Sequence, residues 1–172
     1  MAGSLIKIDE EIVTSAVASV TLTGIDSTYD VYMVRINKLE VETNQRDIKI
    51  RFTESGTPNT TANYDVAQKN LNSAQAFDNQ FSTNQTSMDL SLNIGNDTGE
   101  QFNSVQYIFN ANNSSEFTFV TMENAMMSDN AELRGKQGGG VFTVASAVDG
   151  IQYLGNSTNI DNGVFTLYGL KK

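Results

Sequence analysis

The sequence predicts an all-β protein, an antiparallel β-sandwich of the jelly-roll-like kind with eight or nine strands and one short helix. Apolar and polar residues alternate with period two in segment after segment, and Gly, Asn, Asp and Ser bound these segments. The chain has no internal repeat of fixed period, so a propeller or a solenoid is not expected. Its 172 residues fit one compact unit, and we expect a single domain over residues 1–172.

The first part of the chain predicts three strands. In residues 14–24, TSAVASVTLTG, small and apolar residues alternate with Ser and Thr until Gly24 ends the run. Residues 30–41 place Tyr32, Val34 and Ile36 on one face. Residues 46–56 have the clearest alternation, with isoleucine and phenylalanine on one face and lysine and arginine on the other. This pattern is typical of half-buried antiparallel strands.

The segment 56–87 differs from its surroundings because it is rich in Asn, Gln, Ser and Thr and contains the only proline. We interpret it as a long polar surface excursion, a kind of loop that is often functional. Within it, Tyr64, Ala67, Leu71 and Ala74 recur near the helical period, and Asn63 is a candidate N-cap. The short helix is therefore predicted here.

The second part of the chain returns to alternation. Strands are predicted around Met88 to Ile94, around Val105, Tyr107 and Phe109, and around Phe117 and Phe119. Residues 122–140 are interpreted as a loop, and two further strands follow. Asn162-Gly163 is a strong turn signal before a last strand that explains why the sequence ends on an apolar run.

Composition excludes several kinds of chemistry. The chain has no cysteine and no histidine, which removes disulfides, thiolate sites and the commonest metal ligand and general base. Without histidine a Ser-His-Asp triad is impossible, and among 20 acidic residues a carboxylate pair has no specificity. We therefore expect no enzyme, no cofactor and no metal. The net charge of −9 argues against nucleic acid as a partner. We also expect no membrane partner and no signal peptide, since no apolar run is long enough to span.

Three short motifs contain residue types that could form ligand sites. Asp9, Glu10 and Glu11 could bind a divalent ion, but consecutive residues point in different directions, so a solvated lead-in to the first strand is the better interpretation. Residues 93–100 offer oxygen ligands without the complete calcium-loop pattern and are interpreted as a turn. Residues 135–140, GKQGGG, lack the Ser or Thr of a phosphate loop and are interpreted as a flexible hinge.

Two stretches carry a family resemblance: YDVYMVRINKLEVETNQRDIKIRFTESGTPNTTANYDVA over residues 29–67, and the closing NGVFTLYGLKK. They resemble small structural proteins of tailed bacteriophage particles, particularly phages of marine bacteria. In that family a tyrosine-bearing strand precedes a strand of the form L-x-I-R-F-T, and G-x-F-x-L-Y-G ends a jelly-roll-like sandwich. The resemblance implies a virion component, assembled in the host cytoplasm and displayed on the particle as a homo-oligomer, often a trimer.

The leading functional prediction is a capsid decoration (cement) protein that binds the outside of the assembled head, with the major capsid protein lattice as its partner. Its expected contact elements are Ala2–Glu11, the excursion and the 122–140 loop, because they carry apolar residues that the sandwich does not explain. The expected interface residues are Leu5, Ile6, Phe81, Met122, Met126 and Met127. The alternative is a tail or baseplate attachment module that binds host-surface carbohydrate through loop tyrosines such as Tyr64 or Tyr29.

Overall fold

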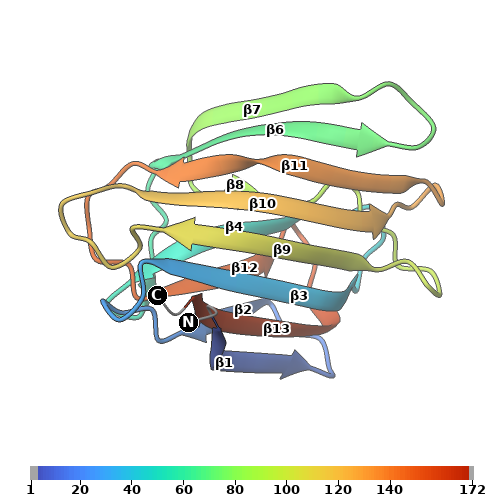
Figure 1. Ribbon diagram of the computed structural model, residues 1–172. Coiled ribbons are helices and arrows are strands. Elements are labelled where there is room, and N and C mark those ends of the chain that lie inside the picture. Colours follow the sequence, from blue (N-terminus) through green and yellow to red (C-terminus); the bar gives the residue numbers. More distant parts are fainter. Residues whose placement is uncertain (1–3, 171–172) are drawn as a thin grey trace.

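The computed structural model describes residues 4–170 and shows two antiparallel sheets packed face to face (Figure 1). The larger sheet has eight strands, which lie side by side in the order β1 (Leu5–Val13), β13 (Ile160–Leu170), β3 (Val31–Val41), β9 (Phe102–Phe109), β10 (Thr118–Met127), β11 (Leu133–Phe142), β6 (Tyr64–Asn72) and β7 (Asp78–Gln85). The smaller sheet has five strands, namely β2 (Ser19–Thr23), β12 (Gly150–Gly155), β4 (Ile48–Glu54), β5 (Thr57–Pro58) and, paired with β4, β8 (Met88–Asp89). The first and last strands of the chain, β1 and β13, pair with each other, so the apolar C-terminal run is held inside the sheet.

The core lies between the two sheets and follows the alternation read from the sequence. On β3 the side chains of Tyr32, Val34 and Ile36 are buried, and on β4 those of Ile48 and Phe52 are buried. Because successive strand residues point to opposite faces, every second residue of these strands enters the core.

Aromatic side chains connect the two sheets. The rings of Tyr153 on β12 and Phe165 on β13 lie 5.3 Å apart, and those of Phe52 on β4 and Phe142 on β11 lie 6.0 Å apart. The Tyr153 hydroxyl donates a hydrogen bond of 2.9 Å to Oε1 of Gln106, which is fully buried. Burial in this apolar setting raises the pKa of Tyr153 well above its ordinary value.

The prediction of a helix in the 56–87 segment was wrong, since the described residues contain no helix. Residues 64–72 form β6 and residues 78–85 form β7, and the two strands pair as a hairpin. Tyr64 and Val66 are buried while Ala67 is exposed, which is strand alternation and not a helical face. The helical spacing was misleading because β6 is also short of β-branched residues and rich in Gln, Lys and Asn.

Three other local expectations need correction. The 122–140 segment is not a loop but the greater part of the β10–β11 hairpin, and residues 135–140 are part of β11 rather than a hinge. Residues 4–170 form thirteen strands rather than eight or nine. Asn162-Gly163 is not a turn: both residues lie within β13, where the register against β3 shifts on either side of Asn162. Gly163 has a φ of 153°, which suits such a bulge.

The alternation in β9 and β10 was recognised, but its apolar members face outward. Val105, Tyr107 and Phe119 are exposed on the outer face of the eight-stranded sheet. The inward positions are occupied by residues that include several polar ones: Phe102, Ser104, Gln106 and Ile108 on β9, and Thr118, Val120 and Met122 on β10. The large sheet thus carries apolar side chains on both of its faces.

Candidate interaction surface

The outer face of the eight-stranded sheet is the candidate functional surface, and strand register shows which residues share it. One row of directly paired residues crosses the whole sheet from β7 to β1, namely Phe81, Ala67, Gly139, Thr121, Tyr107, Met33, Tyr168 and Lys7. Paired residues in a sheet point to the same face. Six strands therefore lie between the edge strand that carries Phe81 and the edge strand that carries Lys7.

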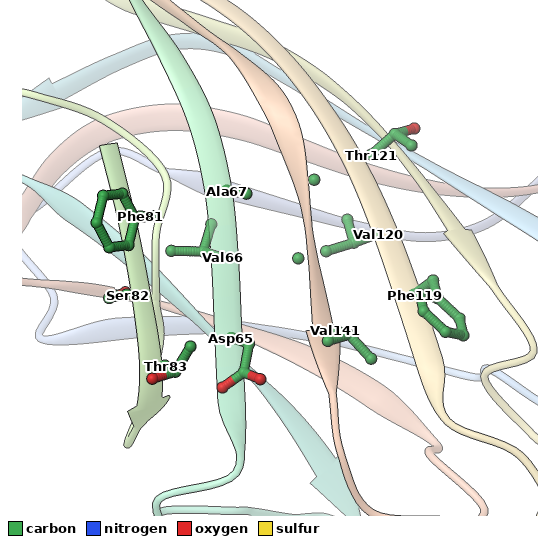
Figure 2. Close-up of a pocket in the computed structure, with 12 residues that line it drawn as sticks. Asp65, Val66, Ala67, Phe81, Ser82, Thr83, Phe119, Val120, Thr121 and Val141 are labelled. Atoms are coloured by element: carbon green, nitrogen blue, oxygen red, sulfur yellow. The ribbon is translucent and has the colours of Figure 1, made fainter. Parts of the chain in front are cut away.

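A groove runs along β11 on this face, and we call it the β11 groove (Figure 2). It has a volume of about 530 Å³ and lies between Phe81 of β7 on one side and Phe119 of β10 on the other. Ala67, Gly139 and Val141 line it between these two rings. Gly139 has no side chain, so the space that a larger residue at this position of β11 would fill stays open.

The walls and floor of the β11 groove are almost free of charge. Asp65 is the only charged residue among those that line it, and its Oδ1 already accepts a hydrogen bond of 2.7 Å from the backbone N–H of Asn84. The remaining polar side chains of the lining are hydroxyls, those of Ser82, Thr83 and Thr121. A nearly uncharged apolar groove on a chain of net charge −9 is suited to an apolar partner surface.

A second apolar hollow of about 330 Å³ lies on the same sheet, lined by Leu71, Phe77 and Leu133 among others. A polar row separates it from the β11 groove: Lys69, Gln137 and Glu123 are paired in succession across β6, β11 and β10. Gln137 Nε2 donates to Glu123 Oε1 at 2.6 Å, which holds this row together. Phe77 and Leu133 were not singled out by the sequence, because both lie at strand ends where alternation gives no signal.

Of the predicted interface residues, Leu5, Ile6, Phe81 and Met127 are exposed, but the fold does not bring them together. Leu5 and Ile6 are on β1, at one edge of the eight-stranded sheet, while Phe81, 78% exposed, is on β7 at the other edge. Ala2, the first residue of the expected contact segment Ala2–Glu11, lies outside the described residues. These residues cannot form one contact surface within a single copy.

The three methionines of β10 divide between the core and the surface. Met122 is 1% exposed and Met126 is 2% exposed, so both belong to the core and their prediction as interface anchors was wrong. Met122 Sδ also accepts a hydrogen bond of 3.1 Å from Gln68 Nε2. Met127, the last residue of β10, is 36% exposed and pairs with Leu133 beside the second apolar hollow. Met122 and Met126 alternate with outward-facing residues along β10, whereas the sequence predicted a loop over residues 122–140.

The tyrosines expected to stack on sugars are placed differently from the prediction. Tyr64 is fully buried in β6, where its ring lies 5.0 Å from that of Phe142, so it cannot meet a ligand. Burial raises its pKa to about 12. Tyr29 is partly buried against the core and its ring covers the backbone of Gly169. Tyr107 and Tyr168 are the tyrosines that face outward in the row of paired residues on the candidate surface, and Tyr107 is the more exposed of the two.

Below β11 the structure contains a buried lysine. Lys136 is 1% exposed, and no acceptor among the described residues forms a hydrogen bond with its Nζ. Burial lowers the pKa of this amine, and the carboxylates of Asp89 and Asp47 oppose the shift. Burial likewise raises the pKa of Asp47, whose Oδ1 accepts a hydrogen bond from the backbone N–H of Asn93. Because Nζ does not reach the surface, Lys136 offers no nucleophile to a ligand in solution.

The acidic motifs have structural partners. Asp9 accepts hydrogen bonds from the backbone N–H groups of Glu10 and Thr23, which ties β1 to β2. Glu100 is buried, and its Oε2 accepts from the N–H of Asp97, which closes the 93–100 loop. Within residues 4–170 no three acidic side chains are arranged to hold a metal ion. No helix in that range could span a membrane.

Comparison with known proteins gives little further information. No family model matches the sequence, and no curated protein matches it. Among solved structures, the chain is similar to the crystal structure of galectin LEC-6 from Caenorhabditis elegans, at 11% identity and a TM-score of 0.34. The match covers 95% of this chain and 96% of that one. At this level the likeness carries no argument about function.

Proposed function

We propose that this protein is a structural subunit of a bacteriophage particle, a decoration protein that binds the outside of the assembled head and not an enzyme. The observation that supports the proposal is the β11 groove, an apolar and nearly uncharged hollow on the outer face of an otherwise acidic β-sandwich. The sequence resemblance to small phage structural proteins supplies the setting. Assignment of the sandwich to the jelly-roll-like kind belongs to the same proposal.

The chemistry of the groove favours a protein as its occupant. A nucleic acid would need a basic surface, and the only charged residue of the lining is Asp65. A sugar would need several convergent hydrogen-bonding groups beside the aromatic rings, whereas Phe81 and Phe119 face a floor of Gly139 and Val141. An apolar segment on the capsid surface would bury both rings. The alternative, a carbohydrate-binding module at the tail, is therefore less well supported.

Binding of this kind stabilises an assembly by mass action. A ligand that binds the assembled lattice and not its separate subunits lowers the free energy of the lattice alone. Each contact can be small, because the many copies on a particle add their effects. The proposed location is the particle exterior, and the protein is proposed to act as a homo-oligomer.

Immunogold electron microscopy of the purified phage particles tests the setting. Gold over the head is the expected result. Label restricted to the tail would support the attachment alternative. Label on no particle, with the protein present only in the infected-cell lysate, would refute both.

A pair of substitutions on neighbouring phenylalanines tests the surface. Phe119 is 46% exposed and lines the β11 groove, whereas Phe117 is 44% exposed and lies just before β10, outside the groove lining. Both rings are too exposed to support the core. We expect Phe119→Lys to weaken binding to heads that lack the protein by at least about thirtyfold, as for a central interface residue, while Phe117→Lys binds normally. Equal binding by both variants would refute the groove as the docking surface.

A further inference from the structure

The two edges of the eight-stranded sheet are protected to very different degrees. An edge strand exposes unpaired backbone N–H and C=O groups and can pair with another chain unless charges or bulges prevent it. The β1 edge carries Lys7, Asp9, Glu10 and Glu11, and its register against β13 shifts between Lys7 and Asp9. It therefore has both kinds of protection.

The β7 edge has almost none. From Asn79 to Gln85 the strand NQFSTNQ has no charged residue and no proline, and Phe81 near its middle is 78% exposed. Asp78 to Ser82 pair with β6 without any register shift, and the one irregularity of this hairpin lies between Ser82 and Gln85, toward the end of the strand. Within the described residues β6 is the only strand beside it (Figure 1). Most β7 side chains are exposed. The backbone groups on the free side of β7 are therefore open to pairing with another strand.

We propose that β7 pairs antiparallel with β7 of a second copy of this chain, with Phe81 opposite Phe81 of the second copy. This two-fold arrangement joins the two eight-stranded sheets into one continuous sheet and leaves their outer faces on the same side. The register also brings Asn79 opposite Thr83 and Gln80 opposite Ser82, so every one of these pairs is uncharged.

Charge identifies the occupant as a second copy. The same pairing at the β1 edge would bring Asp9, Glu10 and Glu11 of two acidic chains together, which like-charge repulsion disfavours. At β7 the only charge is that of Asp78, at the strand end, and in the proposed register it lies opposite Asn84 and not another carboxylate. The opposed Phe81 rings would form an aromatic cross-strand pair, a favourable contact in antiparallel sheets.

The proposal does not depend on the phage setting, but it has a consequence for it. Each copy brings one β11 groove, and the two-fold axis places both grooves on the same face. The dimer would thus offer two apolar sites to one partner surface, which raises the effective affinity. It also differs from the trimer that the sequence resemblance implies, because a two-fold edge contact is complete with two copies.

Because the chain has no cysteine, single-cysteine variants test the register directly. Directly opposed residues in an antiparallel pair have Cα atoms about 4.5 or 5.5 Å apart, within the range of about 4.4–6.8 Å that a disulfide accepts. We expect Phe81→Cys to form a covalent dimer rapidly under mild oxidation. Ile12→Cys is the matched control, because Ile12 is 61% exposed on the opposite edge strand, β1, and is expected to stay uncrosslinked.

Sedimentation equilibrium of the full chain from about 1 to about 100 μM, a range that spans typical weak and moderate dimers, measures the association without a crosslink. The wild type and Ile12→Lys should show the dimer mass, and Phe81→Lys should raise the dissociation constant at least about thirtyfold. Circular dichroism checks that Phe81→Lys is folded, which its exposure leads us to expect. A monomeric wild type, a trimer, or a dimer that Ile12→Lys breaks and Phe81→Lys does not would overturn the proposal. Loss of head binding by Phe119→Lys with an intact dimer separates the two proposals.

Discussion

Truncation of Met122 to alanine tests whether the methionines of β10 stabilise the fold or form an interface. Met122 is 1% exposed, so the substitution removes three buried heavy-atom groups, a loss of about 2.4 kcal/mol at about 0.8 kcal/mol for each. A cavity adds to this value, since large-to-small substitutions in cores cost about 2–5 kcal/mol. Gln68 Nε2 also loses one acceptor, although its second hydrogen bond, to the carbonyl of Asp89, remains. We expect a total of about 3–4 kcal/mol from these contributions.

The assay is urea unfolding at neutral pH, followed by circular dichroism or by tyrosine fluorescence, because the chain has no tryptophan. For a protein of this size the expected loss corresponds to a fall in melting temperature of roughly 6–16 °C. The m value should stay constant, which would show that the denatured state is unchanged. Met127→Ala is the control on the same strand, and with its side chain 36% exposed it should change stability by less than about 1 kcal/mol.

Two results would refute this reasoning. An unfolding midpoint of Met122→Ala equal to that of the wild type would mean that Met122 is not packed in the core. Equal destabilisation by Met127→Ala would mean that burial does not distinguish the two positions. If Met122→Ala kept its stability and lost binding to heads, the sequence-based assignment of Met122 to an interface would be restored.

Three further perturbations follow from the described contacts. Gly138→Ala should cost about 1–3 kcal/mol, because its Cβ would meet the β6 backbone, and Gly139→Ala, whose Cβ faces the β11 groove, should cost less; thermal unfolding of both variants measures this. Lys136→Met should raise the unfolding free energy at neutral pH by about 1–2 kcal/mol, since it removes a buried ammonium group. The pKa of Lys136 is lowered in the folded state, so wild-type stability should rise with pH in a window that ends near the ordinary value of 10.5, and the variant should lack this rise in urea titrations. Burial raises the pKa of Tyr64 to about 12 and that of Tyr153 well above 10, so their contribution is complete below pH 10 and is lost as the pH rises above it. Phenolate absorbance that appears in step with unfolding would show this, whereas full ionisation in a folded protein would contradict it.

The sequence by itself determined the kind of secondary structure and much of its position. Alternation in residues 46–56 predicted β4 and its buried face correctly, because one apolar face and one charged face leave a single way to place that strand. The absence of cysteine and histidine excluded whole classes of chemistry without any structure. The apolar end of the chain was correctly predicted as a paired last strand, β13.

The tertiary structure decided which face of each strand is buried. On β9 and β10 both faces carry apolar residues, so the period-two alternation predicted the strands but not which of their faces is buried. Met122 is in the core and Phe119 is on the surface because the five-stranded sheet covers only one side of the larger sheet. The β11 groove likewise required four strands, the β6–β7 and β10–β11 hairpins that lie far apart in the sequence, to place Phe81 and Phe119 on either side of Gly139. The period-two alternation of a sequence identifies a strand and its two faces. Only the packing of one sheet on the other determines which of these faces is exposed to water.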